Sequence, residues 1–263
     1  MGASGNEAID ELVGFARETL TKLGDESLSF YGRHEAGKRF DEDLITTAEI
    51  HLRELFDHLV AARFPQHRVF DDGPVNDSYT HDSTRYLWIF DPIDGVDNFQ
   101  AGIPIWGQSL ALLDNFWPIL GMFYMPATGD LFHALAEGSA YHGNTVISIS
   151  DETNDIDDES VLLTFSRFHQ HYTPRFPGKI RNLGCTAAHV CYVAHGRADA
   201  ALIANESYRD LAATRVILEA AGGKMFKMDG SGFFLNEYLD GDRIGEHLLV
   251  VPPSRYASVR ECL

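Results

Sequence analysis

Residues 88–99 read Trp88-Ile-Phe-Asp91-Pro-Ile-Asp94-Gly-Val-Asp-Asn-Phe99. The apolar run 86–90 leads into two carboxylates three residues apart, and a glycine follows them. This pattern predicts a buried strand that ends in an acidic turn, which presents oxygen atoms to a hard cation. The glycine allows backbone N–H groups to approach an anion closely. A metal beside an anion indicates phosphate chemistry, whereas an ordinary Asp-Pro/Asp-Gly turn explains the same residues without any function.

The chain is strongly acidic. Its 263 residues include 39 Asp and Glu against 21 Lys and Arg, which gives a formal charge of −18. Such a surface repels nucleic acids and anionic membranes, so we expect neither as a partner. It also repels a phosphate, so a phosphate site in this chain requires metal cations that reverse the local field.

The remaining composition indicates a reducing compartment. The three cysteines, Cys185, Cys191 and Cys262, form neither a CxxC pair nor a disulfide framework. The first residues lack a basic region followed by an apolar stretch, and no run of 18 apolar residues occurs. We therefore expect a cytoplasmic protein.

Apolar periodicity predicts a mixed architecture. Helices are expected over 7–23, ending at Gly24, and over 46–63, with Thr46 or Thr47 as the cap. Further helices are expected over 185–196 and 208–221. The expected strands are 86–90, 106–113, 117–125, 131–136, 145–149, 161–165, 199–203, 224–228 and 247–251. Strands mixed with helices predict α/β layers.

Two polar stretches divide this pattern. Residues 32–43 and 150–159 are rich in charge and poor in apolar residues, so both are expected to be loops. The second loop marks a seam between two lobes. We expect an N-terminal α+β lobe over 1–150 and a C-terminal α/β lobe over 151–263.

Four acidic clusters are candidates for one site. They are Asp43 to Glu49, Asp71-Asp72, the Asp91/Asp94 pair, and Asp210 at a helix start. Each has a structural explanation alone, because carboxylates favour helix N-termini and turns. Together they provide oxygen ligands for two or three Mg²⁺ ions, with Mn²⁺ as an alternative.

The chain resembles the inositol monophosphatase family of Mg²⁺-dependent, lithium-sensitive phosphatases. The family motif W-x-x-D-P-[IL]-D-G-T-x-N-F is met by residues 88–99 except at Val96. The second motif, W-D-x-A-A followed by E-A-G-G, is similar to residues 208–213 and 219–223. The resemblance runs from about residue 8 to 251. It implies a layered αβαβα sandwich and a homodimer.

The resemblance also implies roles for individual residues. Asp91 would bridge two metals, and the carbonyl of Ile93 would bind one of them. Asp94 and Asp210 would hold the second metal, and water on the first would attack phosphorus. The implied phosphate-binding residues are Gly95, Val96, Asp94 and Asp210.

One departure from the family pattern concerns a metal ligand. A Glu-Glu pair, whose second member binds metal and activates water, is replaced here by Asp71-Asp72. Asp72 takes that catalytic and metal-binding position if one residue is deleted from the preceding strand. Otherwise Gly73 takes it.

A second departure concerns the attacking water. The family threonine is Val96 here, and its aspartate partner is Glu49. Valine has no hydroxyl to bind the water, a loss that by analogy with an oxyanion-hole donor costs roughly 10²–10³ in rate. Because both partners have changed, we expect a rebuilt site in which Glu49 orients the water. Asp97 is the other candidate.

The substrate end differs as well. Inositol-selective members carry a glutamate seven residues before the metal aspartate, where this chain has Ile203. Glu206 is nearby, and Arg209 replaces the family tryptophan, either to contact an anionic substrate or to pair with a surface carboxylate.

These residues predict a Mg²⁺-dependent phosphomonoesterase that acts on a small sugar, polyol or nucleotide-derived phosphate. The alternative is a weak or inactive family member with a binding or regulatory role. Val96 and Asp71-Asp72 favour the alternative, and Asp91, Asp94 and Asp210 favour the enzyme.

Overall fold

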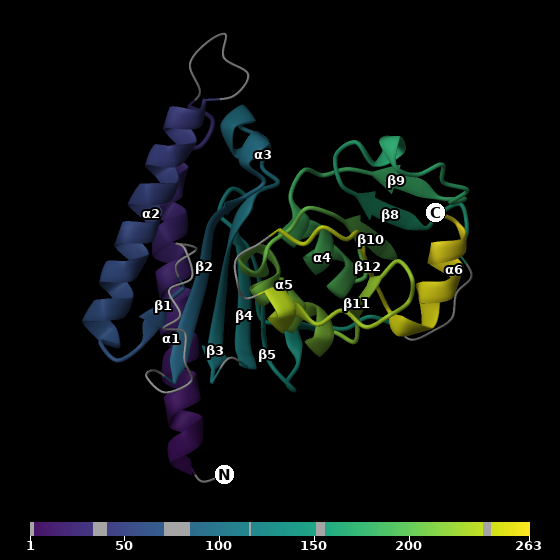
Figure 1. Cartoon of the computed structure of the whole chain (residues 1–263). Helices are drawn as coiled ribbons and strands as arrows, with labels where there is room; N and C mark the ends of the chain where they lie inside the picture. Colours follow the sequence, from purple (N-terminus) through teal and green to yellow (C-terminus); the bar gives the residue numbers. More distant parts are fainter. Residues whose placement is uncertain (1–2, 34–40, 71–84, 116, 151–155, 239–242) are drawn as a thin grey trace.

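The computed structural model describes residues 3–33, 41–70, 85–115, 117–150, 156–238 and 243–263. In these segments the chain forms helices and two β-sheets that alternate in layers (Figure 1). A helix pair, the first sheet, a second helix pair, the second sheet and a C-terminal helix follow one another. This arrangement confirms the predicted αβαβα sandwich.

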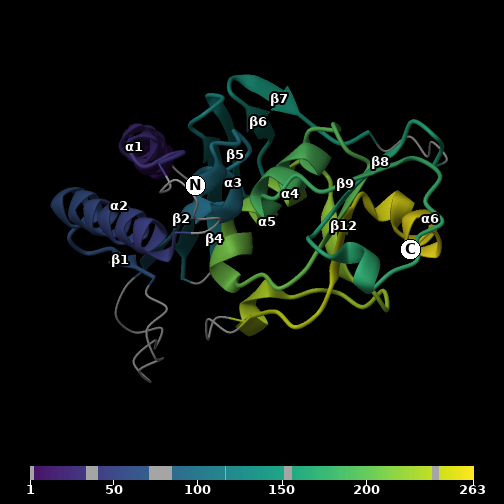
Figure 2. The ribbon, with the colours of Figure 1, turned by 90° about the horizontal axis from the view of Figure 1, so that it is seen from above.

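The first helix layer consists of α1 (Ala3–Leu28) and α2 (Glu42–Arg63). Figure 2 shows the two helices side by side on one face of the first sheet. The side-chain alternation of a strand explains this packing. In β2 (Tyr86–Asp94), Trp88 and Phe90 pack in the core formed with the helix pair, whereas Leu87 and Ile89 face the other side.

The first sheet has the strand order β1 to β7, and all its neighbouring strands are antiparallel except β1 and β2, which are parallel. The short helix α3 (Val96–Ala101) follows β2 directly. The remaining strands are β1 (Arg68–Val69), β3 (Gly107–Asp114), β4 (Trp117–Met125), β5 (Asp130–Leu135), β6 (Ala140–His142) and β7 (Thr145–Ile147).

The second sheet has the strand order β11-β12-β10-β8-β9. Its strands are β8 (Val161–Thr164), β9 (Lys179–Arg181), β10 (Ala200–Ile203), β11 (Lys224–Lys227) and β12 (Leu248–Val251). Helices α4 (Thr186–Ala194) and α5 (Tyr208–Ala220) lie between the two sheets, in one core that includes Ile89 of β2 and Ile203 of β10. On the far face, α6 (Tyr256–Glu261) packs through Val259.

Short 3₁₀ helices complete the second half. They are η1 (Phe168–Gln170), η2 (Leu235–Tyr238) and η3 (Pro253–Arg255). In the described part of the chain, no helix is both long and apolar enough to cross a membrane.

Two predicted helix ends were wrong. Helix α1 continues to Leu28, because Gly24 serves close packing and not termination: a Cβ there would lie 2.5 Å from the ring of Tyr124. Helix α2 begins before Thr46 and Thr47. Its cap is Asp41, whose carboxylate accepts the Leu44 N–H at 3.2 Å.

The described strands of the first sheet end at Ile147, and those of the second begin at Val161. Helix α5, from the second half of the chain, nevertheless packs on β4 of the first sheet. The two halves thus share a core, and lobes at 1–150 and 151–263 stay a prediction.

Candidate active site

The end of β2 is shaped by an irregular pairing with β3. The register shifts between Asp91 and Asp94, so that Pro92 and Ile93 together face one residue of β3. Such a bulge re-aims side chains and interrupts the ladder. The Ile93 N–H donates to the Asp91 carboxylate at 3.4 Å, a long bond within the turn.

Gly95 ends this turn and is required by its geometry. Its φ of +85° lies in the left-handed region, and a Cβ would sit 3.0 Å from the Ile105 carbonyl oxygen. The backbone therefore reverses directly after Asp94 and enters α3 at Val96.

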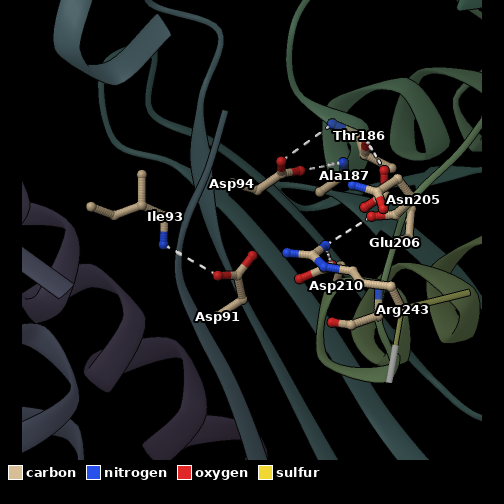
Figure 3. A network of polar contacts seen from close by, with 10 residues as sticks. Asp91, Ile93, Asp94, Thr186, Ala187, Asn205, Glu206, Asp210 and Arg243 are labelled. Atoms are coloured by element: carbon tan, nitrogen blue, oxygen red, sulfur yellow. Dashed lines mark hydrogen bonds and ion pairs between the residues drawn. The ribbon is translucent and has the colours of Figure 1, made fainter. Parts of the chain in front are cut away.

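Asp94 connects the first sheet to the helix layer between the sheets. Its carboxylate accepts the backbone N–H of Ala187 and, at 3.4 Å, that of Thr186, both in the first turn of α4 (Figure 3). The Cys185 thiol also donates to it at 3.3 Å. Burial raises the pKa of Asp94, and the Ala187 N–H opposes that rise.

Asp210 lies in the first turn of α5 and closes a capping box with Ser207. Its Oδ2 accepts the Ser207 N–H at 2.8 Å and also Nη1 of Arg243 at 3.0 Å. The same Nη1 donates to the Asn205 carbonyl oxygen at 2.8 Å (Figure 3). The carboxylate is thus held from two sides at one oxygen.

The aspartates form one electrostatic cluster. Asp91 is 9% exposed, and its pKa is raised well above the usual value, first by burial and then by the negative charges of Asp210 and Asp94. Asp210 raises the pKa of Asp94 as well. Carboxylates from β2 and α5 therefore repel one another across a buried region.

Glu206 extends this region toward the second sheet. Burial, followed by the charges of Asp210 and Asp94, raises its pKa to about 8. Its carboxyl group accepts the hydroxyl hydrogen of Thr186 at 2.8 Å. Ile203, three residues earlier, is 1% exposed in the core, so its side chain lies outside the site.

Glu49 reaches the cluster from α2. Burial raises its pKa, and Arg53, one turn later, opposes the rise. Its negative charge contributes in turn to the raised pKa of Asp91. Val96, at the start of α3, is half-buried against the core formed with α1 and α2.

Two further predicted site residues are Asp72 and Arg209, of which the structure describes only Arg209. Asp72 lies outside the described residues, as do Asp71 and Gly73, so its proposed role stays a prediction. Arg209 is half-buried and lines a pocket together with Arg53, Phe56, Asp57, Val69, Phe70 and Phe90.

Residues 8–247 match the sequence profile of the inositol monophosphatase family. The chain belongs to the inositol monophosphatase family. The predicted membership and the predicted class, phosphoric monoester hydrolase, are both confirmed.

Named relatives in this family differ in substrate. The chain is 29% identical to the histidinol-phosphatase of Chlorobaculum parvum, over 82% of this chain and 85% of that one. It is 27% identical to inositol monophosphatase 1 of Solanum lycopersicum, over 87% and 88%. The solved structure of the Thermotoga maritima IMPase superposes with a TM-score of 0.78 at 22% identity, covering 96% of both chains, and shows the shared fold.

Sequence reasoning missed two parts of this candidate site. The first is the start of α4, where the backbone N–H groups of Thr186 and Ala187 bind Asp94. The Arg243 contact with Asp210 was missed entirely, because a single arginine after Asp240-Gly-Asp242 carries no motif.

Proposed function

We propose that this family member is a Mg²⁺-dependent phosphomonoesterase that hydrolyses a small phosphorylated sugar, polyol or nucleotide-derived compound. One observation carries the proposal: the carboxylates of half-buried Asp94 and Asp210 act on the buried Asp91 carboxylate and raise its pKa. Burying such a group without cations is costly, so it is typical of a metal or catalytic site.

The donor set fits Mg²⁺. As the side chains stand, no three His, Cys, Asp or Glu residues among those described enclose a metal ion. The available donors are nevertheless carboxylate and carbonyl oxygens, the ligands that this hard cation prefers. We propose that Asp91, the Ile93 carbonyl, Asp94, Asp210 and Asp72 hold two or three Mg²⁺ ions, with Mn²⁺ as a substitute.

When bound, Mg²⁺ would lower the pKa of a water molecule and stabilise charge on the leaving oxygen. Glu49 would orient the attacking water, because it faces the cluster from α2 and its charge acts on Asp91. Val96 offers no hydroxyl for this purpose. The N–H groups of Gly95 and Val96 would contact the phosphate, flanked by Asp94 and Asp210.

The leaving group would lie toward the second sheet. Glu206 is the carboxyl group at that end, and Ile203 contributes only core packing. Without a glutamate at position 203, we propose no preference for inositol phosphate over other polyol or sugar phosphates. Histidinol phosphate is a further candidate substrate, since two relatives are named histidinol-phosphatases.

The decisive experiment measures phosphate release from a panel with and without Mg²⁺. The panel contains inositol 1-phosphate, histidinol phosphate, fructose 1,6-bisphosphate and a nucleoside 2′-monophosphate. Asp94→Asn is the site variant, and Asp114→Asn, which alters an ion pair with Arg85 on the first sheet, is the control. We expect turnover that needs both Mg²⁺ and Asp94.

No turnover on any substrate, with Mg²⁺ binding intact by calorimetry, would instead favour the weak or inactive alternative. We further propose a cytoplasmic homodimer. Light scattering after size-exclusion chromatography tests the dimer, and a monomeric mass would contradict it.

A further inference from the structure

The contact between Arg243 and Asp210 has a role that the family resemblance does not assign. Resting on the proposed function, we propose that Arg243 is a positioning residue that orients the Asp210 carboxylate for metal binding. It acts from the loop before β12 on a ligand at the start of α5.

The hydrogen bonds of Asp210 are one-sided. Both donors, the Ser207 N–H and the Arg243 guanidinium, bind Oδ2. Among the described residues, Oδ1 receives no hydrogen bond. The plane of the carboxylate is therefore fixed at one oxygen, and the second oxygen stays available to a cation.

The position of the arginine is itself determined by the backbone. Arg243 Nη1 also donates to the Asn205 carbonyl oxygen at 2.8 Å. The next residue, Ile244, is 1% exposed, and its N–H donates to the Glu206 carbonyl oxygen at 2.7 Å. The segment 243–244 is thus tied to the turn 205–207 that leads into α5, and the guanidinium bridges that turn and the carboxylate.

Arg243 has two opposite effects on metal affinity. Its positive charge repels a cation and lowers the affinity, whereas its hydrogen bond fixes the Asp210 carboxylate and raises the affinity. The side chain is 61% exposed, so solvent and salt screen the repulsion. Residues that orient a metal ligand typically change affinity or activity 10- to 100-fold when mutated. We therefore expect positioning to prevail, at the lower end of that range because the Ser207 N–H remains.

The test is calorimetric titration of Mg²⁺ into the full chain, so it requires no substrate. Arg243→Gln removes the charge and the long reach, and Arg243→Lys keeps a charged donor on a shorter side chain. Arg85→Gln is the matched control: Arg85 is 63% exposed and its partner Asp114 is 21% exposed, against 61% and 21% for the Arg243–Asp210 pair.

We expect Arg243→Gln to weaken Mg²⁺ binding about tenfold. Arg243→Lys should weaken it less, and Arg85→Gln should leave it unchanged. Circular dichroism and thermal melting check that each variant folds, and the lysine variant carries the test if the glutamine variant does not.

Unchanged or tighter Mg²⁺ binding in a folded Arg243→Gln protein, with normal binding in the wild type, would overturn this inference alone. Equal weakening in Arg85→Gln would also overturn it, because the effect would then follow from net charge. A wild-type protein that binds no Mg²⁺ would overturn the metal dependence of the proposed function, and this inference with it.

Discussion

The Asp94 carboxylate accepts the backbone N–H of Ala187, a residue 93 positions further along the chain. One side chain thereby anchors the N-terminus of α4 and belongs to the aspartate cluster. Asp91 differs, because among the described residues its carboxylate accepts one hydrogen bond, from the Ile93 N–H at the long distance of 3.4 Å. The two aspartates should therefore respond differently to substitution.

Asp91→Asn should stabilise the metal-free protein. The change removes a buried charge that Asp210 and Asp94 repel, and it sacrifices little hydrogen bonding. A gain of about 1 kcal/mol corresponds to about 2–4 °C in Tm for a chain of this size. Thermal unfolding in EDTA measures it.

Asp94→Asn should lower Tm under the same conditions. Its amide keeps one acceptor oxygen for N–H donors that now bind two oxygens, and an unpaired buried donor costs about 1–3 kcal/mol. A rise in Tm for both variants would show that repulsion dominates at Asp94 too.

Mg²⁺ should distinguish both variants from the wild type. A ligand at 100 times its Kd stabilises the folded state by about 2.7 kcal/mol. We expect that increment in the wild type and a much smaller one in either variant. An undiminished shift in both would place the cation elsewhere.

The replacement of the family threonine leads to a paired prediction. If Glu49 orients the water as proposed, Val96→Thr should change kcat by less than about threefold. Glu49→Gln should lower kcat by roughly 10²-fold or more, the scale of a lost general base. Steady-state kinetics on the best panel substrate measure both, and a large gain from Val96→Thr with little loss from Glu49→Gln would assign the roles the other way.

Glu206→Gln should act on substrate binding. Its carboxyl group contacts Thr186, and we propose that it lies at the leaving-group end. On that proposal KM should rise about tenfold while Mg²⁺ affinity stays near the wild-type value. Glu219→Gln, at the exposed end of α5 in a pair with Arg215, is the control. A fall in kcat with unchanged KM would instead place Glu206 at the reacting atoms.

The sequence predicted the layered fold because its signals are local. Alternating or continuous apolar runs mark β2 and β12, and apolar spacing at helical period marks α1 and α5. The predicted ends of α1 and α2 were wrong because tertiary contacts determine them. Gly24 packs against Tyr124, and Asp41 caps α2 from a stretch that was expected to be a loop.

The residues of the candidate site that belong to a sequence motif could be predicted, and the contacts between distant segments could not. Asp91, Asp94 and Asp210 stand out in sequence because two motifs surround them. The link between Asp94 and Ala187, and that between Asp210 and Arg243, join distant segments through backbone groups or an isolated arginine. Neither leaves a local pattern, so only the packing of α4 and of the loop before β12 reveals them.

His189 should make stability depend on pH. It lies in α4 and is 2% exposed, and its Nε2 accepts the Leu183 N–H at 3.0 Å. Burial lowers its pKa to about 4. Below pH 6.5 the unfolded chain binds a proton that the folded protein still excludes, so the free energy of unfolding falls as pH falls from 6.5 to about 4.

The gap between the two pKa values, 6.5 and about 4, sets an upper limit of roughly 3.5 kcal/mol for this loss, at about 1.4 kcal/mol per pH unit. His189→Gln retains an acceptor for Leu183 but cannot titrate, so urea unfolding at pH 7 and pH 4.5 should show a shallower fall for this variant. His58→Gln, an exposed histidine on α2, should keep the wild-type slope. Equal slopes in all three proteins would mean that carboxylates alone determine the acid sensitivity. A smaller slope in His189→Gln alone would assign part of the acid sensitivity to α4, the helix whose first residues, Thr186 and Ala187, bind Asp94.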